Sequence, residues 1–281
     1  MKNFPLSAIA STLLLSGLAM AEDYQSISNL GYQRAEVNDV SVNTSSVNTR
    51  YYLSGKSTLG PLDQFDYINT SSNVFAGYWH SSAAGFDRYL SSDSSSTKGD
   101  AYHIGGEYFL GKLLLGASYR HLDMEDDSDT TTLTMGYLLD KNFLVSAKYF
   151  DFEEGNEELL VSAAYTHYIN GNDYLGVTLT SDDDFDYKSV SAKYFKKLSQ
   201  DQYFVGEVLY RDGPHDDYWS AALDYYFSAK TSVSAKYDEN ENYRVGVKHF
   251  LNKNIALSAG YGANGEESDF DLYDVGVTLQ F

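Results

Sequence analysis

The stretch of sequence that decides the fold is Tyr273-Asp274-Val275-Gly276-Val277-Thr278-Leu279-Gln280-Phe281. Side chains alternate between the two faces of a strand, so Tyr273, Val275, Val277, Leu279 and Phe281 share one apolar face. Polar or small residues take the other face. This period of two predicts a strand that is apolar on one side and solvated on the other.

The same alternation recurs from Ser26 onward. Three copies are nearly identical: Val145-Ser146-Ala147-Lys148-Tyr149, Val190-Ser191-Ala192-Lys193-Tyr194 and Val233-Ser234-Ala235-Lys236-Tyr237. Each copy puts its apolar side chains on one face and its serine and lysine on the other. The copies do not share one strand direction, so we interpret them as recurring strand patterning and not as a structural repeat.

Two kinds of break separate these runs, and the two kinds alternate along the chain. The short kind holds tight-turn residues, as in Gly111-Lys112 and Asn170-Gly171-Asn172-Asp173. The longer kind is acidic, as in residues 123–129 and 182–186. An up-and-down barrel requires this alternation of short turns at one rim and longer loops at the other.

Counting the runs predicts sixteen strands, within a range of twelve to eighteen. The segment 59–73 is long for a turn on the short side, and it could hide an extra short strand or tuck against the rim. The expected strands are 27–38, 48–58, 73–82, 101–110, 112–123, 130–139, 143–152, 158–169, 174–181, 187–198, 203–211, 218–227, 231–238, 243–251, 255–263 and 270–281.

We therefore expect an all-β fold, a transmembrane antiparallel up-and-down β-barrel. The 26 Tyr and 15 Phe favour strands, and only 3 Pro interrupt them. No window approaches the roughly 18 apolar residues of a transmembrane helix. The alternative is a soluble β-sandwich, but the regular breaks and the tyrosines at strand ends favour the barrel. A last strand that ends in phenylalanine resembles the C-terminal signal for barrel insertion, so we expect Tyr273, Val275, Val277, Leu279 and Phe281 to engage the barrel-assembly machinery.

The first residues predict export. Lys2 is followed by an apolar stretch from Leu6 to Leu18 and by Ala19-Met20-Ala21, a small-x-small cleavage site. We expect a signal peptide over residues 1–21 and a mature barrel over 22–281 in the outer membrane of a Gram-negative bacterium. An uncleaved anchor is the alternative, but the stretch is short for a spanning helix.

Charge and residue types exclude several functions. The net charge is −20, and loss of Lys2 makes the mature chain −21, so we expect no nucleic-acid partner. There is no Cys, and the six His show no ligand spacing, so we expect neither a metal nor another cofactor. The acidic loops lack the calcium-loop spacing. We interpret them as solvated loops that divalent ions bridge to lipopolysaccharide.

At this point the chain resembles the general bacterial porin family of gammaproteobacteria. The resemblance spans the mature chain and rests on the tyrosine-rich first strand, on Gly60-Pro61-Leu62-Asp63-Gln64-Phe65-Asp66-Tyr67-Ile68, and on the last strand with its terminal Phe281. It implies an outer-membrane barrel acting as a porin. The chain departs from trimeric porins in one respect, because no long third loop is available to fold inward as a constriction.

If apolar residues face lipid, their neighbours face the lumen. About 16–18 strands leave an aqueous channel, and the small inward residues cannot plug it. The charged side chains could brace the wall across strands or select solutes, and the sequence leaves both open. The expected pore-lining residues are Glu107, Arg120, Lys148, Lys193, Glu207, Arg211, Asp224, Lys236, Arg244 and Lys248, with Asp274.

These features favour a porin for passive diffusion of small hydrophilic solutes and ions. The acidic outer loops predict a weak cation preference. The alternatives are a substrate-specific channel, for example for oligosaccharides, or a barrel that acts as an enzyme or adhesin. No nucleophile motif accompanies the histidines, so we expect no enzyme. The inward aromatic residues Phe109, Phe150, Phe195, Tyr226 and Phe250 lie near strand ends, where a girdle or rim role is more economical than a solute track. Outer-membrane lipid and small polar solutes are the expected partners, with a homotrimer left open.

Overall fold

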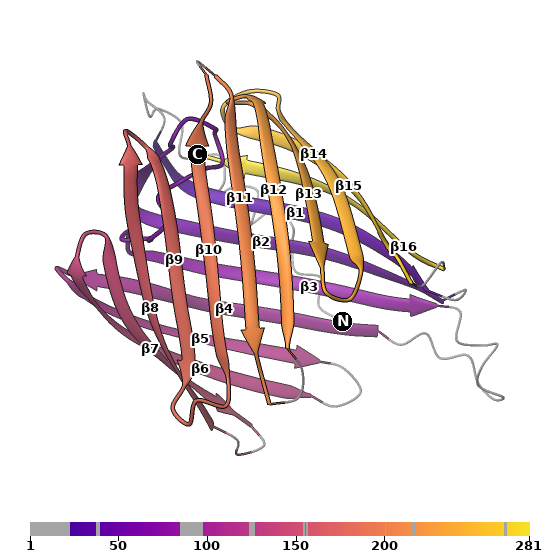
Figure 1. The fold of residues 1–281 in the computed structure, drawn as a ribbon. Coiled ribbons are helices and arrows are strands. Elements are labelled where there is room, and N and C mark those ends of the chain that lie inside the picture. Colours follow the sequence, from indigo (N-terminus) through magenta and orange to yellow (C-terminus); the bar gives the residue numbers. More distant parts are fainter. Residues whose placement is uncertain are drawn as a thin grey trace.

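The computed structural model describes residues 23–37, 40–84, 98–123, 127–153, 155, 157–199, 201–214, 217–266 and 269–281. Within these ranges sixteen antiparallel strands form one closed barrel (Figure 1). Every strand pairs with its neighbours in sequence, and β1 pairs with β16 to close the sheet. The sixteen strands and their antiparallel order confirm the fold that the sequence predicts.

The strands are β1 Asp23–Val37, β2 Val40–Ser57, β3 Asn73–Ala84, β4 Lys98–Leu110, β5 Leu113–Asp123, β6 Ser128–Asp140, β7 Phe143–Phe152, β8 Glu157–Asn170, β9 Asp173–Asp182, β10 Lys188–Lys197, β11 Tyr203–Asp212, β12 Tyr218–Ser228, β13 Thr231–Asp238, β14 Asn242–Phe250, β15 Ile255–Asn264 and β16 Phe270–Gln280.

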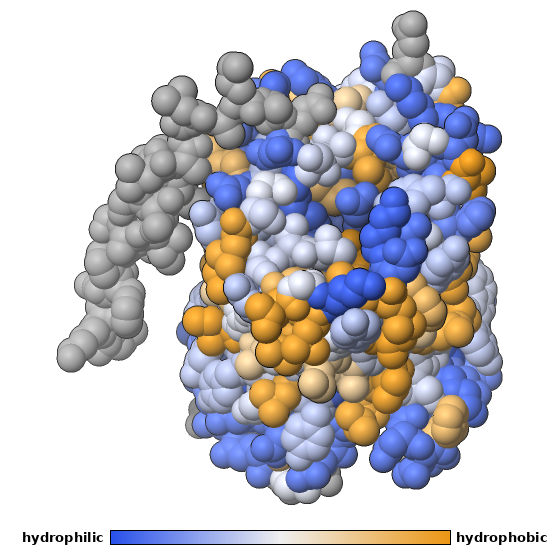
Figure 2. All heavy atoms as spheres, turned by 90° about the vertical axis from the view of Figure 1, so that its left-hand side faces the viewer, coloured by the Kyte–Doolittle hydropathy of each residue, from blue (hydrophilic) through white to orange (hydrophobic). Residues whose placement is uncertain are grey.

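Alternation explains why these residues form a barrel wall. On β6, Leu133, Met135 and Tyr137 are all exposed on one face, while Thr134 and Gly136 take the other. On the side shown in Figure 2, hydrophobic residues gather across the middle and hydrophilic ones lie mostly towards both ends. Closure leaves no edge strand, so each strand's hydrogen-bonding groups find partners within the sheet. The outer surface is therefore apolar and exposes no edge of unpaired backbone N–H and C=O groups.

The first hairpin differs from the expectation. β2 begins at Val40 and not near residue 48, and Val37 pairs with Val40 across a very short connection. Residues 40–47 are rich in Ser, Asn and Thr on both faces, so they lack the apolar period on which the sequence prediction depends. Pairing with β1 and β3 on both sides makes them a strand nevertheless.

Residues 58–72, between β2 and β3, form what we call the inner segment. It contains no extra strand; it enters the barrel at the rim that carries the short turns (Figure 1, purple loop near the label C). Leu62 donates its backbone N–H to Ala229, and its carbonyl accepts from Gln280 Nε2 at 2.9 Å. Gly60 has φ +137°, and a Cβ there would lie 2.5 Å from the Tyr203 ring, so only glycine fits.

Some expectations lie outside the described residues. One of these is the signal peptide over 1–21. Across the described ranges, no helix is long and apolar enough to cross a membrane.

Candidate functional site

The contacts of the inner segment identify the inward face of the wall. Tyr67 Oη lies 2.6 Å from Thr178 Oγ1 on β9, and Gln64 Nε2 donates to Tyr226 Oη on β12 at 2.7 Å. Lys248 Nζ on β14 lies 2.9 Å from Asp63 Oδ2. One short segment can reach strands so far apart around a closed sheet only from inside it. The face that carries Thr178, Tyr226 and Lys248 is therefore the lumenal face.

The structure places the sequence-predicted pore-lining residues on this same face. Each alternates with outward side chains, as Lys193 does between Ala192 and Tyr194, and Arg244 between Tyr243 and Val245. Their shared orientation follows from the period of two. Whether they select solutes remains a prediction.

Some of these charges brace the wall. Lys193 Nζ lies 2.9 Å from Glu207 Oε1, its register partner on β11. Arg244 holds Asp274 with two hydrogen bonds of 2.8 and 2.6 Å. This bidentate pair spans β15, whose Gly260 leaves room for it. The first pair joins neighbouring strands and the second joins β14 to β16 across β15, and both leave less unpaired charge available to a solute.

Other lumenal cations have no carboxylate partner in the described part of the chain. Arg120, Lys148, Arg211 and Lys236 form no ion pair there. A charged group of this kind must remain hydrated, because burying an unpaired charge is costly. The lumenal wall therefore requires water beside it.

The inner segment narrows the lumen at the short-turn rim. Leu59 and Tyr67 pack against a cluster of Tyr174, Phe195, Tyr203, Val205 and Tyr226, and Leu62 packs with Phe250 and Ala256. The constriction comes from the rim opposite the outer loops, which agrees with the alternative that the segment 59–73 tucks against the rim. Phe195, Tyr226 and Phe250 lie at the short-turn ends of their strands, as the expected rim role requires, and the structure adds that they are buried at this rim.

The contacts of residues 59–68 follow one half of the wall. They reach β8 through Asp66 and Tyr168, β9 through Tyr67, and β14 through Asp63. A lumenal hollow of about 370 Å³, lined by Tyr67, Lys193, Glu207 and Lys236, lies beside the segment. The segment thus partly fills the lumen and leaves water-sized space next to it.

Sequence reasoning missed a second lumenal feature, on β2 to β4. Arg50, Phe75, His103 and Trp79 lie in contact there. The alternation of Val74, Ala76 and Tyr78 on the outer face would have placed Phe75 and Trp79 inward. That signal was available, but polar neighbours weaken it in these strands.

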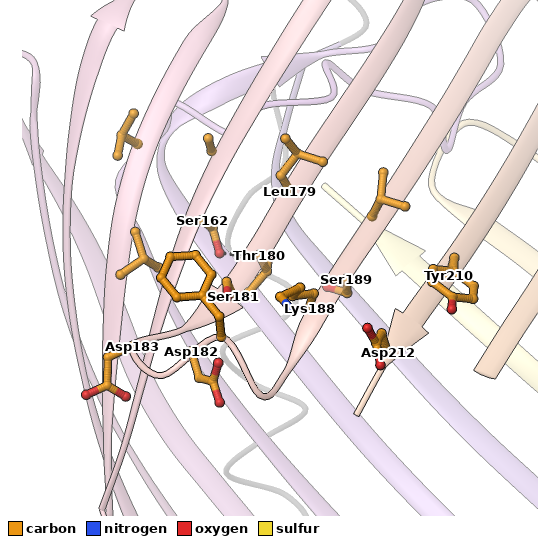
Figure 3. Close-up of a pocket in the computed structure, with 15 residues that line it drawn as sticks. Ser162, Leu179, Thr180, Ser181, Asp182, Asp183, Lys188, Ser189, Tyr210 and Asp212 are labelled. Atoms are coloured by element: carbon orange, nitrogen blue, oxygen red, sulfur yellow. Dashed lines mark hydrogen bonds between the residues drawn. The ribbon is translucent and has the colours of Figure 1, made fainter. Parts of the chain in front are cut away.

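A larger hollow, of about 700 Å³, lies at the loop end of β8 to β11 (Figure 3). Outward side chains such as Val161, Leu179 and Val190 line it, together with Phe185 of the β9–β10 loop. Because these side chains point away from the lumen, the hollow belongs to the outer wall and not to the channel.

Two histidines near the loop rim pair with carboxylates. His80 Nδ1 lies 2.8 Å from Asp100, which also accepts from Tyr78, and His121 Nδ1 lies 2.6 Å from Asp129. Among the described residues no three His, Asp or Glu converge as metal ligands do. These outward pairs join neighbouring strands.

Comparison with known proteins gives a consistent result. A family model described as "Putative general bacterial porin" matches residues 1–281. No curated protein sequence matches the chain. Among solved structures, the Acinetobacter baumannii outer membrane protein Omp33 aligns with TM-score 0.56 at 17% identity, over 93% of this chain and 100% of that one. Pseudomonas aeruginosa OccK7 (OpdD) aligns with TM-score 0.52 at 10% identity, over 92% and 99%. At such identities these likenesses show the fold alone.

Proposed function

Because this chain belongs to the general bacterial porin family, it is an outer-membrane channel, and we propose that small hydrophilic solutes and ions diffuse passively through its lumen with a weak preference for cations. The observation that carries the proposal is the set of unpaired charges on the inward face of a closed sixteen-strand barrel. Barrels of about 16–18 strands are wide enough to hold an aqueous channel.

Passage runs beside the inner segment in this proposal. The segment's contacts favour the wall of β8 to β12 and β14 to β16, so solutes pass along the opposite wall of β3 to β7. Glu107, Arg120 and Lys148 lie on that wall with small residues such as Gly116 and Ser118 between them. Hydrated charges next to small side chains suit solutes that keep part of their own water.

The cation preference follows from the position of the charges. Acidic residues crowd the loop rim, for example Asp182, Asp183 and Asp184, and raise the local cation concentration there. On the wall itself, Lys193, Arg244 and Lys248 each form an ion pair with a carboxylate. The remaining wall cations oppose the loops, which is why we propose a weak preference.

Planar-bilayer recording of the refolded mature chain tests this function. The proposal predicts stepwise KCl conductance and a reversal potential of cationic sign in a salt gradient. Substitution of Asp182, Asp183 and Asp184 by Asn should move the reversal potential towards the anionic side. A triple substitution of Asn252, Asn254 and Asn264 by Ser changes no charge and should leave the reversal potential where it is. Conductance of zero would reject the channel, and a clear anion preference in the unmodified chain would reject the selectivity.

The remaining features of this proposal concern export and assembly. We propose cleavage after Ala21, recognition of the strand from Tyr273 to Phe281 by the barrel-assembly machinery, and lipopolysaccharide held at the acidic loops through divalent ions. A homotrimer stays an alternative to a monomer, and the step multiplicity in the same recordings distinguishes them.

A further inference from the structure

Three rings and a guanidinium form a continuous strip on the lumenal face of β2, β3 and β4. The Arg50 guanidinium lies 4.8 Å from the centre of the Phe75 ring. The Phe75 and His103 rings are 5.4 Å apart, and His103 stacks on Trp79 at 4.9 Å with 26° between the planes. Phe75 and Trp79 are four residues apart on one strand, so the strip runs along the direction of solute travel.

Glycines in the neighbouring positions make room for this strip. Gly77 faces His103 in the β3–β4 register, and a Cβ there would lie 2.5 Å from an imidazole carbon. A Cβ on Gly105 would lie 2.7 Å from the Phe75 ring. Glycine inside a strand weakens it unless another group approaches closely. Here the groups that approach are the His103 and Phe75 rings, together with the side chains of Asn48 and Ser118.

Two guanidinium groups flank the strip. Arg50 forms an ion pair with Glu107 at 3.8 Å and a side-chain hydrogen bond with Tyr52, so only part of its five donors remain for another acceptor. Arg120 lies directly opposite His103 in the β4–β5 register, is exposed, and forms no ion pair in the described part of the chain. A hollow of about 250 Å³ lies beside the rings, lined by Asn29, Asn48, Arg50, Phe75 and His103 among others.

From this arrangement we propose that the β2–β5 wall binds aromatic carboxylates, compounds with a flat ring that carries one carboxylate. The ring stacks on the strip of Phe75, His103 and Trp79, because aromatic pairs attract in offset and edge-to-face geometry. The carboxylate is held by Arg50 or Arg120, whose planar forks match it. Phe75 holds the Arg50 guanidinium in place beforehand.

This site rests on the proposed diffusion function, and it deepens that function by naming a solute class. It also agrees with a weak cation preference. Arg50 pairs with Phe75, which lies nine residues from the loop end of β3 at Ala84, about 30 Å at the usual rise per residue. The Debye length is about 8 Å at physiological ionic strength, so the loop carboxylates act on ions at the mouth and not at this depth.

A fluorescence titration tests the site directly, because the chain has 2 Trp, Trp79 in the strip and Trp219 on the outer face of β12. The variant Trp219→Phe makes Trp79 the sole reporter. Folded protein in detergent is titrated with benzoate, and then with benzamide, benzylamine and cyclohexanecarboxylate. We expect a saturable change with benzoate and at least fivefold weaker binding of the other three, which lack the charge, reverse it or lack the flat ring.

Matched variants in the same background locate the two contacts. Arg120→Gln and Phe75→Leu should each weaken benzoate binding at least fivefold, and Arg120→Lys should recover part of the loss. Lys141→Gln removes one positive charge from the exposed β6–β7 turn and should leave the affinity unchanged. Heat-modifiable migration checks that every variant is folded.

The outcomes separate this inference from the function on which it rests. Equal responses to benzoate and benzamide, or unchanged affinity in both Arg120→Gln and Phe75→Leu, would overturn the site. So would the absence of a saturable response in protein that conducts KCl. Protein that binds benzoate but conducts no ions would instead overturn the proposed diffusion and leave the binding site standing.

Discussion

Removing the Leu62 side chain should undock the inner segment and widen the channel. Leu62 is 8% exposed and packs with Phe250 and Ala256, so it anchors the segment against the wall of β14 and β15. Large-to-small substitutions of buried leucine cost about 2–5 kcal/mol, and the small size of this cluster favours the lower end, about 2–3 kcal/mol. The cost falls on the docked state, because an undocked Leu62 already faces water.

The expected effect on current follows from that energy. Each 1.4 kcal/mol changes an equilibrium tenfold, so Leu62→Ala should raise the ratio of undocked to docked segment by about 30- to 150-fold. In single-channel recordings this is a higher occupancy of the largest conductance level, at unchanged ionic conditions. The segment's hydrogen bonds to Ala229 and Gln280 are made by the backbone of Leu62, so the substitution leaves those donors and acceptors in place.

Leu114→Ala is the matched control. Leu114 is 5% exposed and belongs to β5, where it lies opposite Gly136 of β6. This control should lower the stability of the barrel and leave the distribution of conductance levels as it was. If both variants keep the level occupancy of the unmodified chain while folding normally, the inner segment does not limit the current.

Three further predictions concern other parts of the barrel. Gly176→Ala places a Cβ against the Tyr67 ring, so it should displace the ring and break the Tyr67–Thr178 hydrogen bond. Tyr67→Phe removes only that hydrogen bond, worth about 1 kcal/mol, so Gly176→Ala should raise the conductance more. Equal currents in the two variants would contradict this. Asp274→Asn removes the bidentate partner of Arg244, whose side chain is 48% exposed, so it should cost only about 0.5–1 kcal/mol in denaturant unfolding while the freed cation shifts the reversal potential towards anions; an unchanged potential would show that this pair lies outside the ion path. Deleting Phe281 should lower the folded, heat-modifiable fraction in outer membranes yet spare refolding in detergent, and equal membrane levels would argue against a C-terminal insertion signal.

The sequence predicts most strands of the barrel wall because the signals that mark them, the period of two and the turn residues, are local in sequence. From β6 to β16 the period of two and the turn residues mark each strand to within a few residues, and parity then places side chains such as Lys193 and Glu207 on one face. The start of β2 escapes this reasoning, because residues 40–47 carry small polar side chains on both faces and owe their strand to pairing.

The position of the inner segment cannot be predicted from local sequence, for a different reason. Asp63 and Lys248 are far apart in sequence, and nothing local to either residue indicates their ion pair. The apolar side chains of Leu59, Leu62 and Tyr67 follow no period, so a surface position and a lumenal one look alike from sequence. Tertiary contacts alone decide between them. For the same reason the sequence places aromatic residues such as Phe195 and Phe250 at the strand ends but does not show what buries them there.

The permeability of the lumen to uncharged solutes tests the central claim most directly. Liposomes that contain the refolded mature chain are diluted into isosmotic sugars of increasing size, from a pentose to a tetrasaccharide, and their swelling is followed by light scattering. A water-filled lumen narrowed by the inner segment predicts fast swelling in the pentose, a fall in rate with solute size, and a larger size limit for Leu62→Ala. Folded protein whose liposomes swell in none of these sugars would contradict the account.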